Sequence, residues 1–220
     1  MQSSKAFFSF TAVPNPADHR AYNEWHQLDH QPENLALPGV LHGQRWVRTP
    51  SCATVGHAED ALADLHYLNM YWFREPVTES FREWQELAAR SFQLGRRVDI
   101  RIARRLLMGS FTPVRGYASP RVRVGAGVLP YRPNTGVGIS VTRVEDPRGV
   151  DTHDAFDRFD HDHAPALVLQ PGVAGLWTFA SQSTTADKGW SPRPGSTTFD
   201  EQAEAVPGSI RLVLVYLDEP

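Results

Sequence analysis

Short apolar runs alternate with segments of helical periodicity along most of the chain. The first run covers residues 6–13, and a turn rich in Pro and Asp, a helical segment and a second apolar run at 41–47 follow it. A strand at 64–73, a helix from about 77 to 94 and a long strand at 100–111 complete the first half. This order predicts a βαββαβ unit.

The second half repeats only part of this order. Apolar runs at 136–144 and 174–180 flank a helical segment, and a last strand is predicted at 209–217. The stretch 181–208 between the last two runs is rich in Ser, Thr, Pro and Gly, which predicts a long loop. A second helix and a fourth strand are therefore missing from this half.

A sequence repeat links the two halves. The pattern D-H-x-P-x5-P-G-V begins at Asp29 and again at Asp162, and each of its positions recurs at a constant offset. Pro and Gly at the end of each copy stop a helix and begin a strand. Chance rarely supplies such a match twice in one chain, so the pattern predicts a tandem duplication.

The predicted organisation is a first repeat over 1–114, a linker over 115–135 and a truncated βαββ second repeat over 136–220. The linker is predicted from its three prolines and several glycines. A sheet-edge strand at 121–129 is the alternative for its middle part.

A helix that ends in H-x-P and is followed by L-P-G and a strand resembles the EthD-like branch of the dimeric α+β barrel superfamily. The first copy matches with Trp25-His26, His30-Gln31-Pro32 and Leu37-Pro38-Gly39, whereas Gln170 replaces the leucine in the second. The resemblance implies an α+β fold in which two ferredoxin-like repeats form an intrachain dimeric α+β barrel, the second incomplete. Superfamily members include cofactor-free monooxygenases, haem enzymes, polyketide cyclases, dehydratases and lactone isomerases, so the fold leaves the reaction open.

Two histidines one helical turn apart are the strongest candidates for chemistry. His26 and His30 share a helix face, and Phe159 at the position matching His26 indicates that this face points inward, with His163 matching His30. A buried, neutral imidazole suits a general base, especially beside a carboxylate. We expect His30 to be the acid/base, with His26 and Asp29 as its neighbours. The alternative is that each repeated histidine bonds a carbonyl at its helix end, which we favour for His163.

Metal binding is a weaker interpretation of the same residues. The spacing of His26 and His30, with Glu33 close behind, suits metal ligands. The second copy lacks an equivalent of His26, and neither an additional cysteine nor an H-E-x-x-H pattern accompanies the pair, so no metal is predicted. The run from Asp160 to His163 is predicted to be a solvated turn.

Aromatic residues are concentrated in the first repeat. Alternation along its third strand places Tyr67, Asn69 and Tyr71 on one side, and this mixture of rings, hydroxyls and an amide suits a hydrophobic or aromatic substrate. An ordinary core with a dimer seam is the alternative. The residues expected to line the pocket are Tyr22, Trp46, Tyr67 and Tyr71.

A run of arginines surrounds the last strand of the first repeat. Arg101 and Arg105 would share one side of that strand and could hold a substrate carboxylate. A solvated sheet edge protected by charge is the favoured interpretation. The members of the run are Arg96, Arg97, Arg101, Arg104 and Arg105.

Composition limits the possible binding partners of the protein and the cellular compartment in which it is expected. A formal net charge of −3 over 220 residues gives no positive field to attract nucleic acid. The single cysteine, Cys52, cannot close an intrachain disulfide, which favours the cytoplasm. The apolar stretch near the start is too short for a signal sequence or a membrane span, so no membrane partner is expected. No G-x-G-x-x-G, P-loop or G-x-S-x-G motif occurs.

Together these features predict a small-molecule enzyme that works by acid/base proton transfer on a hydrophobic or aromatic substrate without an organic cofactor, as a dehydratase, cyclase, isomerase or lyase. The alternatives are a cofactor-free or haem-dependent monooxygenase and a non-catalytic protein that binds an apolar ligand. The missing strand would leave a sheet edge that a second chain can cover, so a homodimer and a monomer both stay open.

Overall fold

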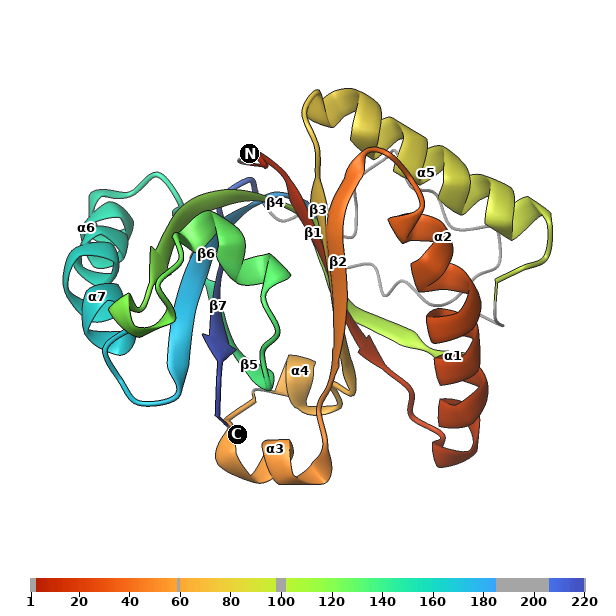
Figure 1. Cartoon of the computed structure of the whole chain (residues 1–220), viewed down its shortest axis with the longest axis horizontal. Coiled ribbons are helices and arrows are strands. Elements are labelled where there is room, and N and C mark those ends of the chain that lie inside the picture. Colours follow the sequence, from red (N-terminus) through yellow and green to blue (C-terminus); the bar gives the residue numbers. More distant parts are fainter. Residues whose placement is uncertain (1–2, 59, 98–101, 185–205, 220) are drawn as a thin grey trace. The chain divides into compact units, whose positions relative to one another are not determined.

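The computed structural model describes residues 3–58, 60–97, 102–184 and 206–219 (Figure 1). The described chain divides into two compact units. We call residues 3–110 the N-terminal unit and residues 111–183 with 206–219 the C-terminal unit.

The N-terminal unit has the predicted βαββαβ order, with two short helices added between its second and third strands. Strand β3 pairs antiparallel with both β1 and β2, and the strand order is β2-β3-β1-β4. Helices α1, α2 and α5 cover one face of this sheet (Figure 1). The elements are β1 (Ala6–Ala12), α1 (His19–Trp25), the π-helical turn η2 (His26–His30), α2 (Gln31–Leu35), β2 (Val40–Val47), α3 (Pro50–Val55), α4 (Asp60–Ala63), β3 (Tyr67–Phe73), α5 (Val77–Gln93) and β4 (Arg104–Ala118).

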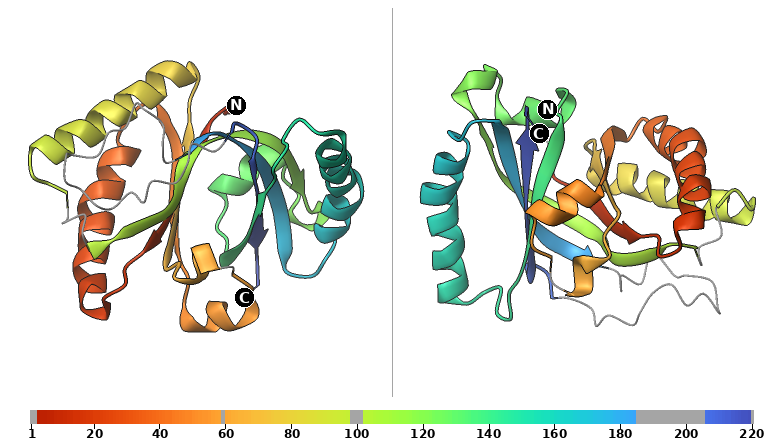
Figure 2. Two further views of the ribbon diagram at one scale, coloured as in Figure 1. Left: turned by 180° about the vertical axis from the view of Figure 1, so that it is seen from behind. Right: turned by 90° about the horizontal axis from the view of Figure 1, so that it is seen from below.

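The C-terminal unit is built on β4, which continues past residue 110 beside β6. Its strand order is β4-β6-β7-β5, and β7 pairs antiparallel with β5 and β6, as β3 does with its two neighbours. Helices α6 and α7 cover one face (Figure 2). The elements are β5 (Gly136–Arg143), α6 (Val150–Arg158), the π-helical turn η6 (Phe159–His163), α7 (Ala164–Leu167), β6 (Val173–Thr184) and β7 (Ile210–Leu217).

Several predicted boundaries differ from the observed ones. The third strand begins at Tyr67 rather than at residue 64, because a helix ends at Ala63. The alternative strand at 121–129 is wrong: this stretch forms two 3-10 helices, Pro120–Val122 and Ala126–Tyr131. Arg123 between them has a φ of 55°, a left-handed conformation that interrupts an extended strand. Most of the predicted loop 181–208 lies outside the described residues.

Both units contain the same irregular helical turn, which ends at the histidine of the repeated H-x-P. The backbone N–H of Gln31 bonds the carbonyl of His26, and that of Ala164 bonds the carbonyl of Phe159, each spanning five residues. The proline that follows has no N–H to donate to the regular ladder, which accommodates the wider turn.

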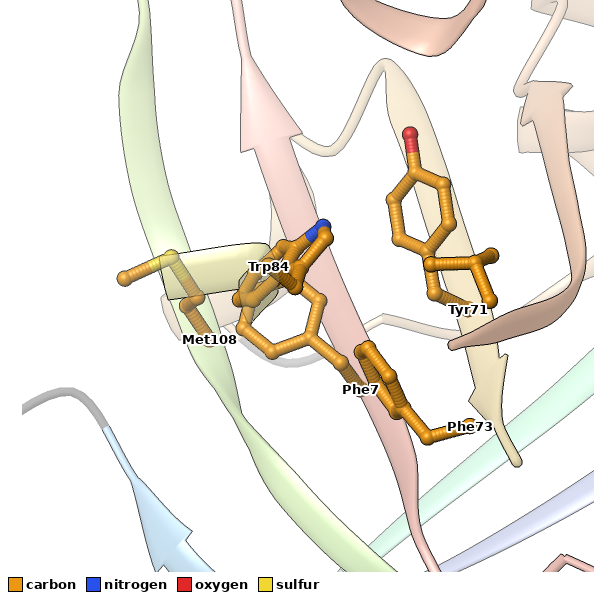
Figure 3. Packing of buried hydrophobic residues seen from close by; sticks show 6 residues of the cluster. Phe7, Tyr71, Phe73, Trp84 and Met108 are labelled. Carbon is orange, nitrogen blue, oxygen red and sulfur yellow. The ribbon is translucent and has the colours of Figure 1, made fainter. Parts of the chain in front are cut away.

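One apolar cluster of the N-terminal unit lies between the sheet and α5. Trp84 of α5 packs against Phe7 of β1, with ring centroids 4.7 Å apart, and against Phe73 at 5.7 Å (Figure 3). Burial of such rings is the main stabilising contribution of this face. In the described part of the chain, every helix lacks the length or the apolarity required to cross a membrane.

Candidate active site

A layer of buried polar side chains lies between the sheet of the N-terminal unit and the helical segment from α1 to α2. Buried polar groups are costly unless they are paired or serve a ligand, so their concentration in one place marks a candidate site. We call this group the polar layer. Its members are Thr11, Tyr22, His26, His30, Asn34, Arg45, Tyr67, Asn69, Tyr71, Arg97 and Arg105.

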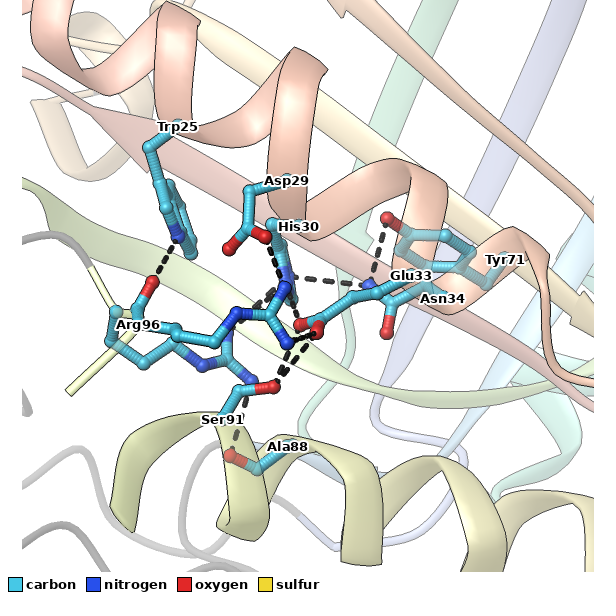
Figure 4. Close-up of polar contacts among 10 residues, drawn as sticks. Trp25, Asp29, His30, Glu33, Asn34, Tyr71, Ala88, Ser91 and Arg96 are labelled. Carbon is cyan, nitrogen blue, oxygen red and sulfur yellow. Dashed lines mark hydrogen bonds and ion pairs between the residues drawn. The ribbon is translucent and has the colours of Figure 1, made fainter. Parts of the chain in front are cut away.

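His30 lies near the centre of the helical side of this layer (Figure 4). Its side chain is 12% exposed, and the ring stacks on Trp25 with centroids 4.7 Å apart. Nδ1 lies 3.4 Å from Oε1 of Glu33, and Nε2 lies 3.3 Å from Nδ2 of Asn34. Because the carboxylate can only accept and the amide nitrogen only donate, these two contacts favour a proton on Nδ1 and place the lone pair of Nε2 opposite the amide of Asn34.

The surroundings of His30 keep the ring neutral. Burial is the largest cause and lowers the pKa of His30 to about 4, against a smaller raising effect of the Glu33 hydrogen bond. Arg97 lowers it further, with Nη1 3.3 Å from both ring nitrogens. At neutral pH the imidazole is therefore unprotonated at Nε2 and can accept a proton.

A chain of hydrogen bonds connects Glu33 to the sheet through His30. Nδ2 of Asn34 also donates to the hydroxyl of Tyr71 at 3.2 Å, and burial raises the pKa of Tyr71 to about 12. Gly43 lies opposite Tyr71 on β2, where a Cβ atom would come within 2.5 Å of the tyrosine ring. The absence of a side chain at Gly43 thus leaves the space that Tyr71 occupies.

The carboxylate beside His30 is Glu33 rather than Asp29. Asp29 forms an ion pair with Arg96, which also reaches Glu33 at 3.0 Å (Figure 4). Ser91 of α5 donates its hydroxyl to both carboxylate oxygens of Glu33, at 2.8 and 3.0 Å. These bonds hold the carboxylate in place against the imidazole.

His26 lies one turn before His30 and is more deeply buried, at 2% exposure. Its ring centroid is 5.3 Å from that of His30 and 6.0 Å from that of Tyr22. Burial, followed by the charges of His30 and Arg45, lowers the pKa of His26 to about 2. Neither Nδ1 of His26 nor the hydroxyl of Tyr22 has a hydrogen-bond partner among the described residues.

Tyr67 marks the other end of the polar layer. Its hydroxyl lies 2.6 Å from Nδ1 of His19 and accepts from Nδ2 of Asn23 at 2.9 Å. The guanidinium of Arg45 lies over the Tyr67 ring at 4.0 Å and donates to Oδ1 of Asn23 at 2.7 Å. Aromatic and cationic groups therefore alternate along this end of the layer.

The structure brings together three of the four expected pocket aromatics, Tyr22, Tyr67 and Tyr71. Trp46 is separate: it pairs with Leu68, so the alternation of β2 places it on the opposite face of the sheet.

The arginine run also differs from its favoured interpretation as a solvated edge. Arg97 contacts His30, and Arg105 donates to the buried hydroxyl of Thr11 at 3.2 Å. Arg104 is exposed, as that interpretation expected, and lies 3.6 Å from Asp64. Arg101 lies outside the described residues.

The equivalent π-helical turn of the C-terminal unit, η6, carries different side chains in its interior. His163 is exposed, so the expectation that both repeated histidines are partly buried is wrong for it. The predicted solvated turn at 160–163 is wrong for Asp160, which is buried and accepts two hydrogen bonds of 2.9 Å from Arg211. The π-helical turn brings Asp160 to the sheet side, where an ion pair occupies the interior.

Four residues of the site were missed by the sequence analysis in these roles: Glu33, Asn34, Arg45 and Arg97. The first two lie three and four positions after His30, so helical spacing could have indicated them. The arginines are distant in sequence, and no local pattern links them to the histidines. Among the described residues, no three His, Cys, Asp or Glu side chains come together in a group able to hold a metal ion.

The antiparallel sheet of each unit, covered on one face by helices, defines an α+β protein, and its likeness to solved structures supports the dimeric α+β barrel fold. One of these is a crystal structure of an anthrone oxidase-like protein, which matches with a TM-score of 0.57 and 11% sequence identity over 99% of this chain and 74% of the other. At this identity the likeness shows the fold alone. No protein-family model and no curated protein matches the sequence.

Proposed function

We propose that this protein is a small-molecule enzyme that removes a proton from a hydrophobic or aromatic substrate, with His30 as the acid/base. The observation that carries the proposal is the Glu33–His30–Asn34 arrangement, in which a buried neutral imidazole is oriented by a carboxylate on Nδ1. This is the geometry that general base catalysis requires. His26 and the Arg96-bound Asp29 are positioning neighbours.

The reaction begins at a carbon next to a carbonyl group. The C–H bond breaks, its proton moves to Nε2 of His30, and the electron pair moves onto the carbonyl oxygen as an enolate. The 3.3 Å contact with Asn34 is long and can be replaced by the substrate. Glu33 stabilises the imidazolium that forms, and the nearby guanidinium of Arg97 stabilises the enolate. Tyr22, Tyr67 and Tyr71 supply the aromatic walls.

This first step is shared by dehydratases, cyclases and isomerases, so the proposal covers these reaction classes without an organic cofactor. A second candidate is cofactor-free oxidation, which the anthrone oxidase-like neighbour favours. The enolate would then react with molecular oxygen: one anthrone and one O₂ give one anthraquinone and one water.

The same proposal includes a duplicated origin and the EthD-like branch. Both units carry a π-helical turn, then H-x-P, then a strand that pairs with the central strand of its sheet. The C-terminal unit lacks an equivalent of Asn34, since Leu167 stands there, and its interior holds Asp160 and Arg211. We therefore assign catalysis to the N-terminal unit alone.

The test uses anthrone as the probe. Without oxygen, the exchange of its methylene protons in D₂O is followed by NMR, and with oxygen, anthraquinone formation is followed by absorbance. We expect the protein to accelerate exchange over buffer, His30→Asn to lower that acceleration by about 100-fold or more, and His163→Asn to leave it unchanged. Anthraquinone formation would favour the oxidative candidate.

Exchange at the buffer rate, or unchanged exchange in a folded H30N protein, would overturn the proposal. Anthrone binding that quenches tryptophan fluorescence without exchange or oxidation would instead support a non-catalytic ligand-binding protein. A Soret band in the purified protein would redirect the oxidative candidate towards haem.

A further inference from the structure

The polar layer, as defined above from the described residues, contains three arginines, Arg45, Arg97 and Arg105, and no carboxylate. Glu33 and Asp29 pair with Arg96, at the outer edge of the site. Neither Arg45 nor Arg105 forms an ion pair with a carboxylate among the described residues. The side chains of Asn23 and Tyr67 contact Arg45, and the hydroxyl of Thr11 accepts from Arg105. A partly buried guanidinium without a counter-charge is costly, so its retention calls for an explanation.

Arg45 has N–H groups that can bind a further ligand. Its Nη2 donates to Asn23, whereas Nε and Nη1 are buried and have no partner in the described structure. Its guanidinium carbon lies 4.0 Å from the Tyr67 ring centroid and 5.4 Å from that of Tyr22. Aromatic rings therefore hold the cation in position but satisfy neither free N–H group.

Two more unpartnered groups lie beside Arg45. The Tyr22 hydroxyl and Nδ1 of His26 are both buried and have no hydrogen-bond partner within the described part of the chain, and their rings are 6.0 Å apart. The hydroxyl can donate, Nδ1 can donate in one tautomer, and Nε and Nη1 of Arg45 can only donate. A group of donors around one cation is complementary to an anion that only accepts.

We propose that Arg45, with Tyr22, His26 and Arg105, forms a subsite for a carboxylate carried by the substrate. This inference rests on the proposed function, because it names the substrate class: an aromatic or hydrophobic carboxylic acid whose ring lies along Tyr67. Such an anion would supply the missing counter-charge. It would also hold the substrate by a group other than the carbon that loses its proton.

A matched pair of ligands tests the subsite by binding alone. Anthracene-9-carboxylate and anthracene-9-carboxamide share one ring system and differ in charge, and each is titrated into the full-length protein by calorimetry. We expect the wild-type protein to bind the carboxylate about ten-fold or more tightly than the amide. Arg45→Gln should abolish this preference, and Arg105→Gln should reduce it. Arg104→Gln, which removes the exposed neighbouring arginine, should retain it.

Equal affinity for the two ligands, no binding of the carboxylate, or an unchanged preference in R45Q would each overturn the proposal. A preference for the carboxylate in a protein that fails to exchange anthrone protons would retain the subsite and reject the catalytic function. Exchange activity without a carboxylate preference would retain the catalytic function and reject the subsite.

Discussion

The indole ring of Trp25 lies parallel to the imidazole of His30, with 8° between the planes and 4.7 Å between the centroids. Trp25 is itself fixed, because its Nε1 donates to the backbone carbonyl of Arg96 at 2.8 Å. The imidazole is thus held on one face by a ring and at its nitrogens by Glu33 and Asn34. A ring restrained in this way presents Nε2 in one orientation.

Removing the stacked ring should loosen His30. We expect Trp25→Ala to lower the rate of anthrone exchange by about ten-fold and the free energy of unfolding by about 1–2 kcal/mol. Trp25→Phe keeps an aromatic face but loses the hydrogen bond, so its rate should fall less. Exchange rates and urea unfolding measure both effects, and equal rates in the two variants would contradict a stacking role.

Adding one methyl group at Gly43 should disturb the site through Tyr71. A Cβ atom there would lie 2.5 Å from the ring, so the ring must shift, and its hydrogen bond with Asn34 is disturbed. We expect Gly43→Ala to cost about 1–3 kcal/mol of unfolding free energy and to slow exchange. Gly138→Ala is the matched control, since its Cβ would meet Val215 at an ordinary 3.8 Å. Its cost should stay within about 0.5 kcal/mol, and a G43A protein as stable as G138A would contradict the packing argument.

The neutral state of His30 makes folding depend on pH. Its pKa falls from 6.5 in the unfolded chain to about 4 in the folded one, so between these values the unfolded chain binds a proton that the folded chain does not. The contribution of neutral His30 to the free energy of unfolding is therefore complete above about pH 6.5 and is lost as the pH falls towards 4. His26, whose pKa falls to about 2, acts in the same direction.

Between pH 7 and pH 4, the free energy of unfolding of the wild-type protein should fall by about 3 kcal/mol more than that of His30→Asn. Urea unfolding at a series of pH values measures this difference. The exposed His163 provides the control, and His163→Asn should keep the wild-type dependence on pH. An H30N protein with the wild-type slope would show that His30 titrates normally.

The buried ion pair of the C-terminal unit should contribute to folding but not to catalysis. Asp160→Asn keeps the shape of the side chain but leaves Arg211 without its counter-charge, which should cost about 3–5 kcal/mol. Glu24→Gln breaks the exposed pair with Arg20 and should cost far less than Asp160→Asn. Under conditions where D160N remains folded, its anthrone exchange should match the wild-type rate, and a selective loss of exchange would contradict this division of roles.

Much of the fold could be predicted from apolar runs, because strands and helices that bury one face carry a periodic pattern. The turn before H-x-P shows where this reasoning stops. The charged run from Asp160 to His163 was interpreted as a solvated turn, but it forms a π-helical turn in which Asp160 is buried. The π-helical turn has a partly local cause, because Pro165 cannot donate a backbone hydrogen bond. The number of residues in the turn, however, depends on packing.

The candidate site was predicted to the extent that it lies on one helix and one strand. His30, Tyr67 and Tyr71 lie where helix and strand periodicity place them, and Glu33 follows His30 at helical spacing. Arg45 and Arg97 are far from the histidines along the chain. Their approach requires the folded sheet and the end of α5, which no local spacing encodes.

The protonation state of the His30 ring tests the central claim most directly. A ¹H–¹⁵N spectrum of the histidine side chains at pH 7, with His30 assigned by comparison with H30N, reports which nitrogen carries a proton. We predict a neutral ring protonated at Nδ1, with Nε2 free to accept. A charged ring, or a proton on Nε2, would remove the acceptor that the proposed chemistry requires and would contradict the account.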